Sequence, residues 1–114
     1  MVEQIPKQMI GQVHGELSVS RHGNIVVISA KDDIFRPFGV LILDLERGSL
    51  GSLLVAEGYR RKGVATALLK EAERIAKEAG LDRIQAGTHF ENEVAHNLLR
   101  KLGYFEMTVA EKRL

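Results

Sequence analysis

The first third of the chain alternates apolar and polar residues with the period of β-strands. Residues 15–20 alternate strictly, and residues 25–28 form an apolar, β-branched run. Between them, residues 21–24 (Arg-His-Gly-Asn) are typical turn formers. The pattern therefore predicts a β-hairpin.

Two further strands are predicted after a polar loop over residues 31–37, in which Pro37 disfavours helix at the preceding residue. They cover residues 38–45 and 49–55. Gly51 lies inside the second of them, where a glycine marks a bulge or the close approach of another backbone.

The pattern changes to a helical period after residue 62. Residues 63–79 carry an apolar stripe and are followed by Gly80, a typical helix stop. Residues 82–88 then resemble a short strand. A right-handed strand-helix-strand crossover would place this strand parallel to residues 49–55.

The C-terminal part predicts one more helix and a final strand. Asn92 can cap a helix that ends at Gly103, and strand-like residues resume at Tyr104, with Val109 near the second arm of a final hairpin. The predicted fold class is α+β: a mixed, mostly antiparallel sheet with a β-α-β crossover and two main helices.

Composition adds limits to this outline. The 114 residues suit a single domain over 1–114, and a net charge of +1 gives no general reason to expect nucleic acid or a membrane as partner. The chain has no cysteine, and its four histidines are scattered, so no metal site is expected. Without a signal-like or spanning apolar segment, a cytoplasmic protein is expected.

The strongest chemical signal is a cluster of cations at the start of the long helix. Arg60, Arg61 and Lys62 precede Gly63, although helix N-termini favour negative charge. Gly63 lacks the side chain that would hold a ligand away from the backbone. We interpret the stretch as a pyrophosphate cradle; the alternative is a solvated charge cluster on a tight turn. A triphosphate-binding loop is disfavoured, because Val64 and Ala65 occupy its lysine and hydroxyl positions.

The same stretch resembles the acetyl-CoA motif of the GNAT acetyltransferase superfamily. That motif has Val on a strand, then Gln or Arg, two free positions, Gly, one free position, and Gly or Ala. Val55, Arg60, Gly63 and Ala65 follow this order.

A later motif of the same family has Asn, then Ala three residues on, and an aromatic residue after the glycine that ends the helix. Asn92, Ala95, Gly103 and Tyr104 match it. The two motifs in order, on the predicted scaffold, are fairly specific. The resemblance covers the chain from about Gly39 onward.

The resemblance implies that the coenzyme lies between two parallel strands that diverge. The backbone at residues 53–55 would receive the pantetheine arm, and amides of residues 61–65 would hold the pyrophosphate. Thr66 could offer its hydroxyl to a phosphate or to the helix end, and Asn92 could contact pantetheine or act only as a cap. The residues implied to bind coenzyme are Leu53, Leu54, Val55, Arg60, Arg61, Lys62, Gly63, Val64, Ala65, Thr66, Asn92 and Leu99.

The implied activity is transfer of an acetyl group from acetyl-CoA to a primary amine by direct attack. The backbone N–H of Val55 is the expected oxyanion donor. Leu99 stands where many relatives have a tyrosine that protonates the thiolate; Tyr104 or Tyr59 could substitute, or the thiolate could leave unprotonated. Candidate bases are Glu91, His89, Asp44 and Glu46, or a chain of water molecules.

Two alternatives concern the whole protein. The chain could be a non-catalytic, CoA-binding sensor or assembly module, because a clear acid and base are missing. The family usually has a helical pair after its first strand, and residues 20–25 leave space only for a turn. We therefore expect an open acceptor face and a possible homodimer.

Overall fold

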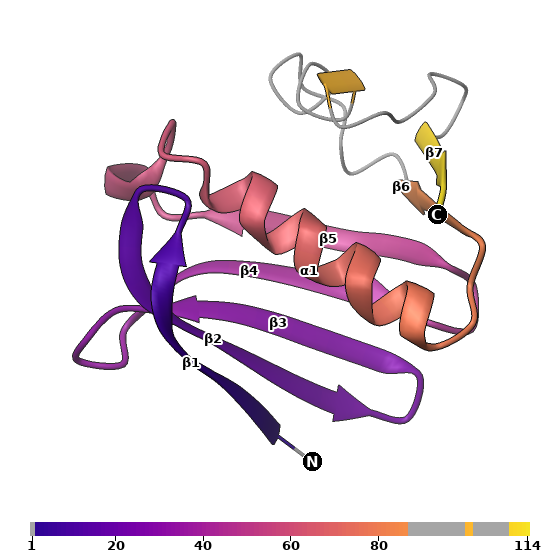
Figure 1. Cartoon of the computed structure of the whole chain (residues 1–114), viewed down its shortest axis with the longest axis horizontal. Helices are drawn as coiled ribbons and strands as arrows, with labels where there is room; N and C mark the ends of the chain where they lie inside the picture. The colour runs from indigo at the N-terminus through magenta and orange to yellow at the C-terminus, as the bar shows by residue number, and fades with distance from the viewer. Residues whose placement is uncertain (1, 87–99, 102–109) are drawn as a thin grey trace.

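A seven-stranded sheet, in the order β1 to β7, forms one layer, and the helix α1 crosses one of its faces (Figure 1). The computed structural model describes residues 2–86, 100–101 and 110–114. The elements are β1 (Val2–Ile10), β2 (Val13–His22), β3 (Ile25–Lys31), β4 (Pro37–Asp44), β5 (Ser49–Val55), the short 3₁₀ helix η1 (Glu57–Tyr59), α1 (Val64–Glu78), β6 (Arg83–Ala86) and β7 (Ala110–Arg113).

The first five strands are antiparallel neighbours. The predicted hairpin is confirmed, with His22 opposite Ile25 across the Gly23–Asn24 turn. Strand β1 was not predicted. Its register shifts between Ile5 and Gln8, around Pro6, and this irregularity interrupts the alternation by which a strand is identified.

The bulge expected at Gly51 is present. Leu41 lies opposite Leu53 and Leu43 opposite Leu50, so that Gly51 and Ser52 of β5 together face Ile42 of β4. A Cβ at Gly51 would lie 3.5 Å from the Cβ of Ile42, which is an ordinary contact. The glycine therefore marks a bulge and not a close backbone approach.

The predicted long helix is confirmed as α1, followed by Gly80 with a φ of +89°. Its apolar stripe is buried against the sheet at Val64, Leu68, Leu69, Ala72, Ile75 and Ala76. A Cβ at Gly39 of β4 would lie 3.1 Å from side-chain carbons of both Val64 and Leu68. Gly39 thus lets the first turns of the helix rest directly on the sheet.

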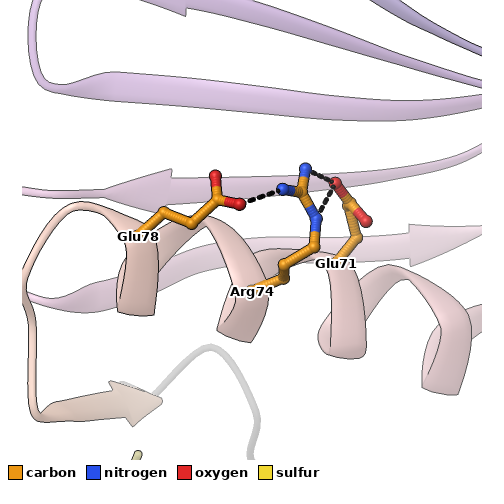
Figure 2. Close-up of polar contacts among 3 residues, drawn as sticks. All are labelled: Glu71, Arg74 and Glu78. Atoms are coloured by element: carbon orange, nitrogen blue, oxygen red, sulfur yellow. Dashed lines mark hydrogen bonds and ion pairs between the residues drawn. The ribbon is translucent and has the colours of Figure 1, made fainter.

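Glu71, Arg74 and Glu78 form an ion-pair network along α1 (Figure 2). The Arg74 guanidinium donates to Glu71, and its Nη1 donates to Glu78 at 2.8 Å. The hydrogen bond to Glu71 is the main cause of the raised pKa of Arg74. Lys112 of β7 also donates to Glu73 at 3.0 Å, which ties the last strand to the helix.

The crossover is confirmed for the described residues. β6 runs parallel to β5, with Ser49 opposite Gln85 and Leu50 opposite Ala86, and β7 pairs with β6 in the antiparallel sense. The predicted helix over 92–103 lies outside the described residues except for 100 and 101, which are helical. Among the described helices, none is long and apolar enough to cross a membrane.

Candidate functional site

The β1–β2 turn and the β5–α1 connection lie together at one end of the sheet (Figure 1). The β1–β2 turn touches the β5–α1 connection, because the Gln12 N–H donates to the Lys62 carbonyl oxygen at 2.7 Å. The Ala56 N–H donates to the Phe38 carbonyl at 2.9 Å, which fixes the start of the same connection on β4. The connection is therefore held from both sides.

A run of free backbone donors opens α1. Arg61 and Gly63 both have positive φ, +63° and +78°, and no side chain caps the helix at Gly63. Within the described part of the chain, the N–H groups of residues 61–66 donate no hydrogen bond. Successive amides of this kind at a helix N-terminus attract an anion.

The three cations predicted for this site have no carboxylate partner among the described residues. Arg60, Arg61 and Lys62 are exposed, none forms an ion pair there, and the first turn of α1 contains no acidic residue. Unpaired positive charge beside the positive end of a helix is unfavourable without a counter-ion. Charge and backbone donors therefore favour the same kind of ligand, a phosphate group.

The edge of β5 offers a further donor. Ala56 directs its N–H toward β4, so the N–H and C=O of the preceding Val55 point the opposite way, toward the side of β6. Among the described residues β6 pairs with β5 only at Ser49 and Leu50. The Arg60 Nε donates to the Val55 carbonyl at 3.1 Å, which leaves the Val55 N–H as the open group.

The side chains of the predicted coenzyme residues lie in different environments. Val64 is fully buried and can present only its backbone to a ligand, whereas Leu53 is partly buried and packs against the core. Leu54 is 65% exposed, and Ala65 and Thr66 are half-buried on the first turn of α1.

Tyr59, one of the alternative acids, is stacked on Phe38. The ring centroids are 4.6 Å apart and the planes differ by 19°. Tyr59 is half-buried and its N–H donates to the Ala56 carbonyl at 2.9 Å. It lies in the same connection as the cations.

The suggestion that Asp44 or Glu46 acts as base is wrong. Asp44 Oδ1 accepts hydrogen bonds from the N–H groups of Glu46 and Arg47 at 3.0 and 3.2 Å, and thus stabilises the β4–β5 turn. That turn joins the start of β5, and the strand separates it from Val55 by roughly 20 Å. Both carboxylates lie at the wrong end of the sheet.

The remaining predicted site residues, His89, Glu91, Asn92, Leu99 and Tyr104, lie outside the described residues. A groove of about 510 Å³ between α1 and the β1–β2 hairpin contains none of the predicted residues. It is lined by Gln8, Met9, Ile10, Leu17, Ala67, Lys70, Glu71 and Arg74.

A known protein family matches the segment of the chain that contains β5 and α1. Residues 13–104 match the family model described as the acetyltransferase (GNAT) family, and the chain belongs to that family. Strands β2 to β6 and all of α1 fall within the match, and β1 and β7 lie outside it.

One relative matches in sequence, and two solved structures match in fold. An N-alpha-acetyltransferase of Sulfurisphaera tokodaii is 35% identical over 66 residues, which are 57% of this chain and 40% of the relative. A GNAT-family acetyltransferase of Staphylococcus aureus superposes with a TM-score of 0.72 at 19% identity, over 80% of this chain and 68% of that one. The PaiA N-acetyltransferase of Thermoplasma acidophilum was solved in complex with coenzyme A. It superposes with a TM-score of 0.70 at 24% identity, over 80% of this chain and 62% of that one. The chain thus aligns with less than half of the curated relative's length.

Sequence reasoning missed three residues that shape this site: Gly11, Gln12 and Gly39. The first two form the β1–β2 turn, and a glycine at the first turn position between apolar residues was an available signal for a tight hairpin. Gly39 had no such signal, because only the packed helix reveals why a side chain there is excluded.

Proposed function

We propose that this chain is an acetyl-CoA-dependent N-acetyltransferase that acts on a primary amine. The observation that carries the proposal is the run of free N–H groups over residues 61–66, beside three cations without a carboxylate partner among the described residues. The position of this run, at the start of the long helix in a GNAT-family chain, supports a coenzyme diphosphate as the ligand.

In this proposal the backbone binds most of the coenzyme. The N–H groups of residues 61–66 and the side chains of Arg60, Arg61, Lys62 and Thr66 hold the phosphates. The open edge of β5 at residues 53–55 accompanies the pantetheine arm. Asn92 and Leu99 would contact the same arm from the second predicted helix.

Transfer needs no covalent bond to the protein. The amine nitrogen attacks the thioester carbon, a C–N bond forms, the C–S bond breaks, the nitrogen loses a proton and the thiolate leaves with the electron pair. The Val55 N–H would stabilise the negative charge that develops on the carbonyl oxygen. We assign Glu91 as the base that accepts the amine proton and Tyr104 as the acid that protonates the thiolate.

A non-catalytic CoA-binding module is the second candidate. The observation that favours it is Leu99, an apolar residue at the position where the resemblance implies a tyrosine. Such a module would bind the coenzyme through the same backbone donors and would transfer nothing.

The acceptor side is proposed to be open and completed by a second copy of the chain. The Gly23–Asn24 turn joins β2 directly to β3, at the place where a helical pair would otherwise wall the acceptor site. An open face suits a protein N-terminus, a lysine side chain or a small amine. Sedimentation of a monomer would contradict the dimer.

Mass spectrometry separates the two candidates. The chain is incubated with acetyl-CoA and a panel of amines that includes peptide N-termini, lysine peptides and polyamines. Acetylated product that disappears in the Glu91→Gln variant supports the enzyme. Coenzyme binding without any acetylated amine supports the binding module.

A further inference from the structure

The β1–β2 turn packs against the backbone of the proposed phosphate loop. Gly11 has a φ of +61°, and a Cβ built on it would overlap the Lys62 carbonyl oxygen and lie 2.5 Å from the Gly63 carbonyl carbon. A Cβ on Gly63 would in turn lie 3.3 Å from the Gly11 Cα. The two glycines are therefore in direct backbone contact: Gly11 has no space for a side chain, and at Gly63 a Cβ would be tightly packed.

A hydrogen bond fixes the orientation of this contact. The Gln12 N–H donates to the Lys62 carbonyl oxygen at 2.7 Å. The peptide between Lys62 and Gly63 is trans, so its C=O and its N–H point in opposite directions. Because the carbonyl faces the β1–β2 turn, the Gly63 N–H must face away from it, toward the open side of the loop.

The same bond has an electrostatic effect. A free carbonyl oxygen beside a phosphate would repel it, whereas a carbonyl that accepts from Gln12 is turned away and its lone pair is occupied. The turn therefore orients the Gly63 N–H toward the anion and the Lys62 carbonyl oxygen away from it.

We propose that Gly11 and Gln12 are positioning residues for coenzyme binding, acting through the Lys62–Gly63 peptide and not by touching the ligand. This inference rests on the proposed function of the loop. Both residues precede the segment that matches the family, which begins at residue 13. The β1–β2 turn is therefore part of the coenzyme site of this chain although it lies outside the matched segment.

A second hairpin in the chain supplies a matched control. Gly23, in the β2–β3 turn, has the same φ of +61°, and a Cβ there would meet nothing within 4 Å. Asparagine tolerates positive φ, so glycine can be replaced by asparagine at both turns. Gly11→Asn places the new side chain against the Lys62–Gly63 backbone, and Gly23→Asn places it where no neighbour is close. Gln12→Pro is the complementary variant: it adds no atom at Gly11, removes the donated N–H and places its Cδ against the Lys62 carbonyl oxygen.

The test titrates the full-length wild type, Gly11→Asn, Gln12→Pro and Gly23→Asn with coenzyme A and with pantetheine, which lacks the phosphates. We expect Gly11→Asn and Gln12→Pro to bind coenzyme A about tenfold more weakly than Gly23→Asn does, with unchanged affinity for pantetheine. A merely structural role would weaken both ligands in proportion.

The other outcomes are decisive as well. Equal affinity of the three variants for coenzyme A overturns the positioning role and leaves the proposed function intact. Absence of coenzyme A binding to the wild type overturns the proposed function and this inference with it. Loss of folding in both Gly11→Asn and Gln12→Pro, with Gly23→Asn folded, also overturns it, because the turn would then serve the fold and not the ligand.

Discussion

The Arg60 guanidinium reaches back to the end of β5, where its Nε donates a hydrogen bond of 3.1 Å to the carbonyl oxygen of Val55. This contact closes the connection between β5 and α1 and holds a positive charge beside the open Val55 N–H. A side chain fixed in this way loses less conformational freedom when a ligand binds.

Arg60→Ala is expected to weaken coenzyme A binding about tenfold, because a charge-assisted contact worth roughly 1.5 kcal/mol is lost. Calorimetric titration measures the change. Arg47→Ala is the control, since Arg47 is an exposed cation at the opposite end of β5. Equal affinities of the two variants would show that Arg60 has no part in binding.

Gly63→Ala is expected to lower the free energy of unfolding by about 1–2 kcal/mol, because alanine is strained at a φ of +78°. It should also weaken coenzyme A binding by distorting the phosphate loop. Gly80→Ala carries comparable strain at +89° with nothing within 4 Å of its Cβ. If Gly63→Ala and Gly80→Ala bind coenzyme A equally well, Gly63 does not shape the phosphate site.

The Arg61→Ala and Lys62→Ala double variant tests the electrostatic part of the site. Both side chains are exposed, so their attraction for phosphates should be screened by salt. We expect wild-type affinity for coenzyme A to fall between low and high ionic strength, and the double variant to show a shallower dependence. Parallel salt dependences for the two proteins would contradict this.

Gly39→Val is expected to destabilise the fold by about 1–3 kcal/mol, since a side chain at this position overpacks against Val64 and Leu68. The strain lies beneath the first turns of α1, so coenzyme A affinity should fall along with stability. Chemical denaturation and titration of the same preparation measure both. Unchanged stability would mean that the helix adjusts freely on the sheet.

Arg74→Gln should affect stability alone. The side chain is 42% exposed, so after screening by solvent its ion pairs with Glu71 and Glu78 are expected to contribute only about 0.5–1 kcal/mol. Because folding raises the pKa of Arg74, the guanidinium stays charged and its deprotonation does not remove this contribution from neutral pH up to its unfolded value. A loss of coenzyme affinity in this variant would contradict the placement of the site.

The sequence predicted the parts of the fold that depend on local periodicity. The strands around Gly23–Asn24, the bulge at Gly51 and the helix ending before Gly80 all follow from patterns within a few residues. Strand β1 was not predicted, because its bulge interrupts the alternation of apolar and polar residues. Local patterns therefore defined the scaffold and missed its irregular edge.

The candidate site was predictable in the same limited sense. The cations at 60–62 and the glycine at 63 marked the loop, since their chemistry is local. The contact from Gln12 to Lys62 joins residues fifty positions apart, and no local pattern reports such a pair. Asp44 and Glu46 were proposed from their proximity in the predicted layout, which lacked the register that places Asp44 opposite Ser49, at the other end of β5 from Val55.

The most direct test of the whole account is calorimetric titration of the full chain with coenzyme A, accompanied by a thermal denaturation series. We expect saturable binding of one coenzyme per chain and a melting temperature that rises with coenzyme concentration. No heat of binding and no shift in melting temperature at millimolar coenzyme would contradict it.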